Sequence, residues 1–512
     1  MFRSLAPKYV RVGFPQTFAI SAALRRNSPS VSSGYIYCNA RNISSTNEKK
    51  SSSPSMGSPV TSTHGIESTI STAATTETTN ASKNYLDTLT SNELFGYMVI
   101  GMATITRPIL DLVIKLFPYT PLWIIRALVY QNYCGGDNLS QVLKTGERLA
   151  ERGIRNMMVS YTVEACDGKK MSVSIEKIIE ETERSVTDAL VPHTVRMIEE
   201  VVEGVSTQEE ITKVINEVPP GYVALKPTGL IENAANVLLH YQNPKYATQY
   251  DELVANCERV CKIAVEENRK LAEKYPLRAA PFIVIVVDAE RNDLQQGVYK
   301  LQRDLMAKFN RPLDSTKKAT LGDACVVGTV QMYLKESQAI LKLDDELAKK
   351  GGYVLGWKLV RGAYIHSEPN RGVIHDTKED TDKNYDLGIS QTITNMKGEN
   401  PTVGHLVVAS HNGDTQLKAT QLLSEIGDDT RAQHVRANVI LGQLLGMADN
   451  ITYDLISNHN TKNIIKYVPW GPPLETKEYL LRRLEENGDA VRADSGWPLV
   501  KGIIAAFFRR AF

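Results

Sequence analysis

The sequence lacks the marks of several common protein classes. Six cysteines in 512 residues, with no Cys-x-x-Cys pair, indicate neither a disulfide scaffold nor a structural zinc site. Gly-x-Gly never occurs, and neither a Rossmann fingerprint nor a Walker loop is present. Arg107 and Pro108 break the apolar stretch at 94–117, so it falls short of the roughly 20 apolar residues that cross a bilayer. A net charge of +1 argues against a chain-wide field for nucleic acid.

Acidic residues are absent from the first 47 positions, where six basic residues occur. This composition is typical of a mitochondrial transit peptide, with a plain basic tail as the alternative. Between positions 43 and 82, 20 of 40 residues are Ser or Thr, so we expect this segment to be disordered. The predicted organisation is a transit peptide at 1–47, a linker at 48–83, a helical region at 84–150 and a catalytic barrel at 151–512.

Short β-rich apolar runs recur along the body of the chain, between segments with helical spacing. We predict eight strands, at 156–163, 222–225, 282–287, 325–332, 353–360, 405–409, 437–441 and 464–468. Their alternation with helices indicates an α/β fold, a (βα)8 TIM-like barrel with extra N-terminal helices and a helical insertion at about 167–220, after the first strand. A doubly wound open sheet is the structural alternative, against which the missing Gly-x-Gly counts.

Polar residues collect after the predicted strands, at the carboxyl ends where such a barrel carries its chemistry. Polar groups at the ends of apolar strands are costly unless they have partners, so this many on one rim indicates a site. They are Lys226, Asp288, Glu290, Gln331, Lys358, Arg361, Tyr364, Ser410, His411, Asn412, Gln443 and Tyr467.

The segment after the last strand places two arginines side by side. In Tyr479-Leu-Leu-Arg482-Arg483-Leu-Glu-Glu486-Asn487, a helical step of about 100° brings Tyr479, Arg482, Arg483 and Glu486 to neighbouring positions. Adjacent guanidinium groups can grip a planar carboxylate, and Glu486 is near enough to hold one of them. A solvated basic helix face is the alternative, because exposed charge pairs are common on helices.

Six motifs, in the same order, resemble the proline dehydrogenase family. They are Val287-Asp288-Ala-Glu290, Gln331-Met-Tyr333-Leu334, Trp357-Lys358-Leu-Val-Arg361-Gly-Ala-Tyr364, Val408-Ala-Ser410-His411-Asn412, Gly442-Gln-Leu444-Leu-Gly-Met447 and the 479–487 segment. The resemblance runs from about residue 95 to the C-terminus. It implies a (βα)8 barrel that holds FAD without a Rossmann domain and oxidises L-proline to Δ1-pyrroline-5-carboxylate. It also implies electron transfer to ubiquinone and peripheral association with the matrix side of the mitochondrial inner membrane; the sequence does not indicate an oligomeric state.

The resemblance implies a substrate role for eight matching residues. Arg482 and Arg483 would grip the proline carboxylate, with Glu486 as their support. Lys226 would lie beside the substrate, although Pro227 makes this run more rigid than is usual in the family. The proline ring would be enclosed by Tyr364, Leu444, Tyr467 and Tyr479.

The resemblance also implies cofactor roles. Lys358 would donate towards flavin N5, at a position where many bacterial members carry Arg, and Gln331 would bind the flavin edge. Asp288 looks like the active-site acid, which either moves a proton or only anchors neighbouring cations. The cofactor would further be lined by Arg361, Gly362, Ala363, Ser410 and His411.

Three other functions stay open at this point. A Schiff-base aldolase-type barrel would use Lys226 and need no flavin. A mitochondrial scaffold protein would have kept the fold and lost activity, against which the retained Gln331 and Lys358 count. A hydroxyproline dehydrogenase is the third, and Tyr467 argues against it because its ring would crowd a substrate hydroxyl. No metal site is predicted.

Overall fold

The computed structural model describes residues 85–163, 173–312, 316–362, 364–365, 368–490 and 496–511, without the side chains of Val129, of residues 482–490 and of Ala511. The chain divides into two units, Met1–Gly65 and Ile66–Phe512, and every described residue belongs to the second. The predicted transit peptide at 1–47 and linker at 48–83 lie outside the described residues.

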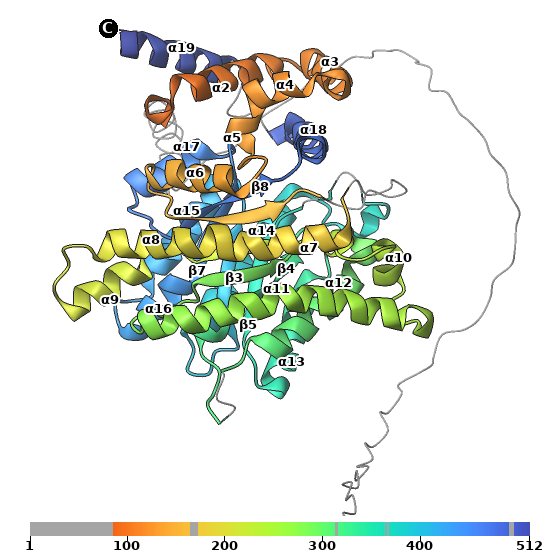
Figure 1. Cartoon of the computed structure of the whole chain (residues 1–512), viewed down its shortest axis with the longest axis vertical. Helices are drawn as coiled ribbons and strands as arrows, with labels where there is room; N and C mark the ends of the chain where they lie inside the picture. The colour runs from red at the N-terminus through yellow and green to blue at the C-terminus, as the bar shows by residue number, and fades with distance from the viewer. Residues whose placement is uncertain are drawn as a thin grey trace, which may run out of the picture. The chain divides into compact units, whose positions relative to one another are not determined.

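Eight parallel strands close into a barrel in chain order (Figure 1). Met158 on the first strand is paired with Tyr222 on the second and with Tyr467 on the last, so the sheet closes on itself. This confirms the predicted (βα)8 barrel and shows that the open doubly wound alternative was wrong. The strands are β1 Asn156–Tyr161, β2 Gly221–Leu225, β3 Ile283–Val287, β4 Val326–Gln331, β5 Leu355–Val360, β6 Val403–Ala409, β7 Val439–Leu444 and β8 Ile464–Trp470.

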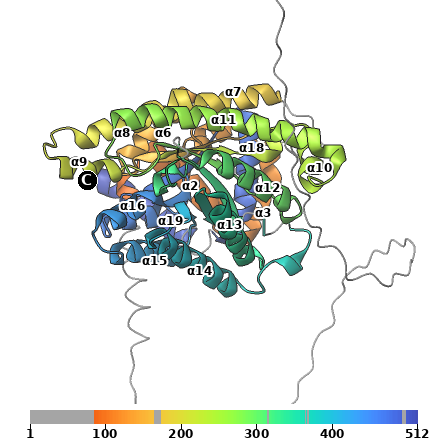
Figure 2. The ribbon, with the colours of Figure 1, turned by 90° about the horizontal axis from the view of Figure 1, so that it is seen from below.

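Helices surround the strands (Figure 2) because most outward-facing side chains of the strands are apolar and need cover. The predicted insertion after β1 is helical, with α7 Ile175–Arg184, η3 Ser185–Leu190, α8 Val191–Val202 and α9 Gln208–Asn216. The outer helices that follow are α10 Ala234–Leu239, α11 Ala247–Lys274, α12 Asn292–Phe309, α13 Ser337–Gly351, α14 Lys378–Lys397, α15 Gly413–Glu425, α16 Thr430–Asn438, α17 Asp449–Ser457 and α18 Pro473–Ala490.

One buried hydrogen-bonded group lies among the apolar side chains of the barrel interior. The hydroxyl of Tyr222 donates to Nε2 of His405 at 2.7 Å, and Nδ1 of His405 lies 3.1 Å from the side-chain oxygen of Asn438. Burial lowers the pKa of His405 to about 4, so the ring is neutral and its Nε2 can accept a hydrogen bond from the Tyr222 hydroxyl. The remaining space is filled by Met158, Ala224, Val284, Val286, Val327, Val407, Ile440 and Ile465.

Additional helices from both ends of the described chain pack together on one side of the barrel (Figure 1). Ile503 and Ala506 of the last helix are fully buried against Leu86, Leu89 and Leu94, so the C-terminal segment caps a core. These helices are α2 Ser91–Ala103, α3 Arg107–Leu116, η1 Phe117–Tyr119, α4 Leu122–Ile125, η2 Arg126–Tyr130, α5 Gln131–Tyr133, α6 Leu139–Ala150 and α19 Trp497–Ala511.

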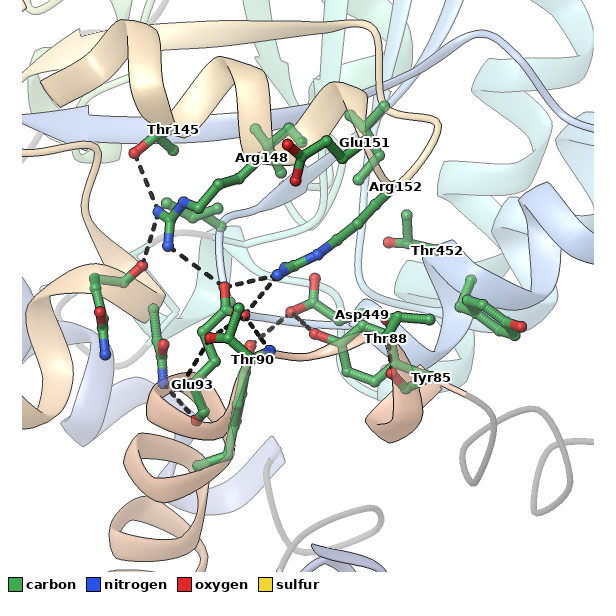
Figure 3. Close-up of a pocket in the computed structure, with 18 of the residues that line it drawn as sticks. Tyr85, Thr88, Thr90, Glu93, Thr145, Arg148, Glu151, Arg152, Asp449 and Thr452 are labelled. Atoms are coloured by element: carbon green, nitrogen blue, oxygen red, sulfur yellow. Dashed lines mark hydrogen bonds and ion pairs between the residues drawn. The ribbon is translucent and has the colours of Figure 1, made fainter. Parts of the chain in front are cut away.

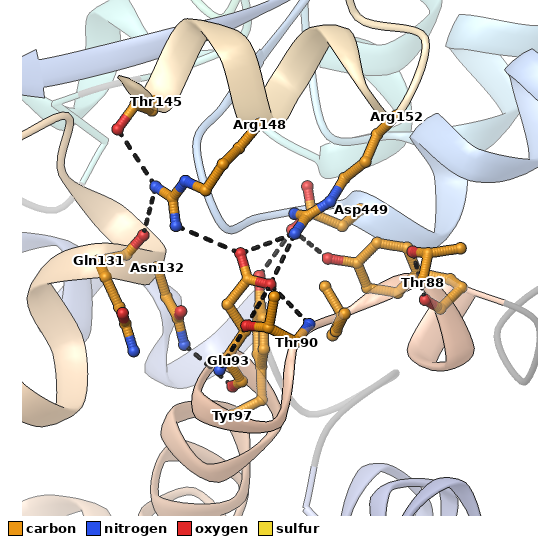
Figure 4. A network of polar contacts seen from close by, with 12 residues as sticks. Thr88, Thr90, Glu93, Tyr97, Gln131, Asn132, Thr145, Arg148, Arg152 and Asp449 are labelled. Carbon is orange, nitrogen blue, oxygen red and sulfur yellow. Dashed lines mark hydrogen bonds and ion pairs between the residues drawn. The ribbon is translucent and has the colours of Figure 1, made fainter. Parts of the chain in front are cut away.

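A polar network joins these N-terminal helices to the barrel and lines a cavity of about 330 Å³ (Figure 3). Glu93 of α2 accepts hydrogen bonds from the Thr90 hydroxyl at 2.9 Å and from the Arg152 guanidinium at 2.6 Å (Figure 4). Burial alone would raise the pKa of Glu93, but the hydrogen bond and charge of Arg152 outweigh it and hold the pKa below its usual value. Glu93 is therefore a charged, almost fully buried anchor for the start of α2.

Asp449 is the second carboxylate of this network, at the start of α17. Its carboxylate accepts hydrogen bonds from the hydroxyl groups of Tyr85 at 2.8 Å and Tyr97 at 2.6 Å. One carboxylate oxygen lies 2.6 Å from Nζ of Lys466. Burial opposes ionisation of Asp449, yet the charge of Lys466 and these hydrogen bonds leave its pKa lowered. The Lys466 side chain extends outward from β8, so this pair connects the barrel wall to the N-terminal helices.

Candidate active site

The centre of the barrel mouth holds a hydrogen-bonded group from three strands. Asp288 follows β3, where its backbone N–H extends the sheet by donating to Leu225 at 2.9 Å. Its carboxylate accepts a hydrogen bond from Nζ of Lys358 on β5 and another from the Tyr467 hydroxyl on β8, the latter at 2.9 Å. The Lys358 ammonium also lies 5.6 Å from the centre of the Tyr467 ring. Closure of the barrel thus brings together residues that are 70 and 179 positions apart from Asp288.

The charges of this central group are mutually compensated. The side chains of Lys358 and Asp288 are only 8% and 16% exposed, and a buried ammonium is stable only beside a carboxylate. Burial, reinforced by the charge of Asp288, raises the pKa of Tyr467 well above its usual value. Tyr467 therefore stays protonated and donates to Asp288, whose carboxylate also holds the Lys358 ammonium.

A second group surrounds Glu290, next to the centre. Its carboxylate accepts a hydrogen bond from the Thr228 hydroxyl at 2.8 Å and lies 3.3 Å from the Tyr364 hydroxyl. The side-chain amide of Gln331 donates to the backbone oxygen of Glu290 at 2.8 Å. Gln331 is fully buried, and its Oε1 has no hydrogen-bond partner among the described residues. This orphaned acceptor indicates that a ligand donor belongs at the end of β4.

Lys226 and Tyr479 form the side of the mouth towards α18. Nζ of Lys226, at the end of β2, lies 6.0 Å from the centre of the Tyr479 ring. Tyr479 is buried against Phe117 and Tyr130 of the N-terminal helices. The first part of α18 is thereby fixed over the mouth, directly after β8.

The opposite rim is built from the ends of β5, β6 and β7. Arg361 donates from Nε to the Ser410 hydroxyl at 3.0 Å, and its guanidinium also contacts Asp382 of α14 and Thr415 of α15. Nε2 of His411 accepts the backbone N–H of Leu444 at 3.0 Å. Because Leu444 is paired with Tyr467, this rim continues into the central group.

Most of the predicted site residues therefore meet at one mouth. Gly362 lies there too, where a β-carbon would come within 3.1 Å of the Tyr333 ring. Ala363 lies outside the described residues, as do the side chains of Arg482, Arg483 and Glu486 on α18. The residues placed at the mouth are Lys226, Asp288, Gln331, Lys358, Arg361, Gly362, Tyr364, Ser410, His411, Leu444, Tyr467 and Tyr479.

One residue predicted at the rim, Gln443, lies on the other side of the sheet. Gln443 faces away from the mouth, where its Oε1 accepts from Nζ of Lys466 at 3.0 Å. Successive strand residues point to opposite faces, so Gln443 cannot share a face with its neighbour Leu444. Thr228 and Asp382 also lie at the site, although neither was predicted there. Thr228 could have been found two positions after Lys226, whereas Asp382 has no local signal.

The donor set of the mouth suits a flavin ring, which has several acceptor atoms and one ring N–H. Lys358 presents a buried cation for a developing negative charge. The unpaired Oε1 of Gln331 can accept the ring N–H, and hydroxyl and cationic groups follow at Ser410 and Arg361. The residues present are thus compatible with FAD.

Similarity to known proteins indicates one enzyme family. The family described as proline dehydrogenase matches residues 142–494. The "Probable proline dehydrogenase, mitochondrial" of Schizosaccharomyces pombe is 29% identical over 421 residues, 73% of this chain and 78% of that protein. "Proline dehydrogenase 1, mitochondrial" of Dictyostelium discoideum is 26% identical over 444 residues, 81% of this chain and 72% of that protein.

A solved structure shares the fold. Proline utilization A (PutA) from Bdellovibrio bacteriovorus, inactivated by N-propargylglycine, aligns with a TM-score of 0.54 at 14% identity. The alignment covers 81% of this chain but only 42% of that longer one. Since the family match alone spans well over half of the sequence and includes the barrel and its mouth, the chain belongs to the proline dehydrogenase family.

Proposed function

We propose that this protein oxidises L-proline to Δ1-pyrroline-5-carboxylate, the first step of proline catabolism, with FAD as cofactor and ubiquinone as electron acceptor. The observation that carries the proposal is the Asp288–Lys358–Tyr467 group, which lies at the barrel mouth within the family match. The relatives named mitochondrial and the acid-free basic start support a mitochondrial location. We place the enzyme on the matrix side of the inner membrane, where ubiquinone is accessible.

Bound FAD supplies the two-electron oxidant, with N5 as acceptor of the hydride that leaves the proline ring carbon next to nitrogen. Lys358 places a fixed positive charge where negative charge develops, and Asp288 and Tyr467 hold it there. Gln331 supplies a buried acceptor for the cofactor ring. The rest of the cofactor site comprises Arg361, Gly362, Ala363, Ser410 and His411.

The substrate is held by its carboxylate in this proposal. Arg482 and Arg483 grip the carboxylate and Glu486 supports them, which fixes the ring orientation and lowers the barrier by positioning. Tyr467 packs beside the ring and leaves too little room for a ring hydroxyl, which favours proline over hydroxyproline. Lys226, Tyr364, Leu444 and Tyr479 complete the enclosure.

The visible absorption spectrum of the purified full-length protein tests this function. We expect a flavin spectrum that bleaches when L-proline is added without oxygen, and much weaker bleaching with hydroxyproline. A colourless protein that binds no added FAD would contradict the proposal. It would favour a Schiff-base reaction at Lys226, which borohydride trapping with a carbonyl substrate would detect.

A further inference from the structure

Exposed apolar side chains are concentrated on a few neighbouring elements. Of the sixteen large hydrophobic side chains exposed among the described residues, twelve lie on α2, α3, η1, α4, the start of α18 and α19. These elements pack against one another on one side of the barrel (Figure 1). We call these twelve residues the apolar face: Phe95, Met102, Ile109, Leu112, Leu116, Tyr119, Leu122, Trp123, Leu474, Trp497, Ile504 and Phe508.

The exposed residues form stripes along their helices. Ile109, Leu112 and Leu116 are spaced three and four apart on α3, which aligns them on one side. On α19, Ile504 and Phe508 are likewise four apart, while Ile503 is fully buried against the core. Each helix therefore uses one side for internal packing and has a second apolar side left over, an arrangement that a soluble surface does not require.

The apolar face carries a positive charge. The helices α2, α3, η1, α4 and α19 and the start of α18 at 473–478 contain six basic residues and four acidic ones, and one of the acids, Glu93, is buried. Two of the basic residues form ion pairs, Arg107 with Asp111 and Arg509 with Asp87, and the net charge remains positive. Tyr119 and Trp123, two of the most exposed residues of the face at 83% and 71%, are of the kind that prefers the boundary between lipid and water. The basic residues are Arg107, Lys115, Lys477, Lys501, Arg509 and Arg510.

We propose that the apolar face docks the protein onto an anionic lipid bilayer, lying in the headgroup region without crossing it. Apolar burial and basic charge are the two signals that together give stable peripheral binding. Among the described residues no single helix meets the length and hydropathy of a membrane span, and the α2–α3 pair meets them only jointly, with a bend of 111°. The inference deepens the proposed function by naming the surface that reaches a membrane-dissolved acceptor.

Charge and composition argue against two other occupants. In a symmetric dimer the basic residues of one copy would face those of the other, which is repulsive. The Ser/Thr-rich stretch at 43–82 has only five large apolar residues, too few to cover the face. An anionic lipid surface satisfies both the apolar area and the charge.

Vesicle flotation with the full-length protein tests the proposal. We expect the wild type to float with phosphatidylcholine vesicles containing one-fifth cardiolipin, and less with phosphatidylcholine alone. Leu112→Glu with Leu116→Glu should lower the bound fraction about 10-fold or more. The matched control is Leu343→Glu with Leu347→Glu on α13, also exposed and four apart, at the other end of the view in Figure 1. That variant should bind like the wild type.

Two outcomes would overturn the inference. One is equal loss of vesicle binding in both variants. The other is a wild type that does not bind vesicles but forms a dimer, which the Leu112→Glu with Leu116→Glu variant fails to form. Turnover of L-proline with a water-soluble quinone separates this test from the proposed function, since it should be equal in all three proteins. Inactivity of all three with normal flotation would contradict the enzyme proposal and leave the docking surface standing.

Discussion

At the scale of single residues, the barrel mouth depends on one buried cation. Lys358 is compensated by Asp288, and the Tyr467 hydroxyl keeps that carboxylate in place. The ammonium therefore has a fixed position before any ligand binds. Electrostatic stabilisation is effective when the charged group does not need to reorganise during the reaction.

Replacing Lys358 tests this role. Lys358→Met should lower kcat by about 100-fold, because the charge is lost and Asp288 is left buried without its cation. Lys358→Arg should retain most activity, since it preserves the charge. Steady-state kinetics and the flavin content of each variant provide the measurement. Full kcat in the Met variant would remove the proposed role.

His405 makes the stability of the barrel depend on pH. Burial lowers its pKa from 6.5 to about 4, so below pH 6.5 the unfolded chain binds a proton that the folded chain refuses. The free energy of unfolding should therefore decrease as pH falls through this window, by up to about 1.4 kcal/mol per pH unit.

Denaturant unfolding at several pH values between about 4.5 and 7 measures this slope. His405→Gln should lower this slope by the contribution of close to one bound proton, about 1.4 kcal/mol per pH unit. The variant should also be less stable than the wild type at every pH. His193, whose pKa burial also lowers to about 4, is unchanged in the variant and contributes to the slope that remains, as does His434, whose pKa burial lowers too. Identical slopes in both proteins would exclude His405 as a source of the pH dependence.

At the scale of elements, α18 joins the site to the N-terminal helices. Tyr479 packs against Phe117 and Tyr130, so the helix is anchored at its first half. Arg482→Met should raise KM for proline strongly while FAD remains bound, because the carboxylate loses one arm of its proposed clamp. Kinetics and the flavin spectrum measure both quantities. Unchanged KM would contradict the clamp.

The network between α2 and α17 predicts a stability effect. Asp449→Asn should lower the free energy of unfolding by about 3–5 kcal/mol, because Lys466, 1% exposed, would be left buried without its counter-charge. Asp454→Asn is the control on the same helix, in a more exposed place, and should stay within about 0.5 kcal/mol. Denaturant titration measures both, and equal effects would show that the buried pair is not the cause.

The elements were predictable where local pattern determines them. All eight strands appear close to the expected positions, because each is a short apolar run between segments with helical spacing. Side-chain direction was less predictable: Gln443 and Leu444 are adjacent, and only the register of β7 shows which of them faces the mouth. The partner of Arg361 could not be predicted, because 58 acidic residues were available and helix packing selects Asp382.

At the scale of the whole molecule, we propose that the acid-free basic segment at 1–47 carries the mitochondrial address. Deleting residues 1–47 should leave the protein in the cytosol, because the acid-free cationic stretch is lost. Residues 1–47 fused to an unrelated cytosolic protein should carry it into mitochondria. Microscopy or fractionation measures both. Mitochondrial accumulation of the truncated chain would contradict the targeting prediction.

The two ends of the described chain are bound to each other. Asp87 accepts a hydrogen bond from Arg509 at 2.6 Å across 422 residues, and Tyr85 reaches Asp449 across 364. During translation, α19 can pack against the inner side of α2 only after the ribosome has made nearly the whole polypeptide. Docking of α19 onto α2 is therefore a late step in the folding of the newly made chain.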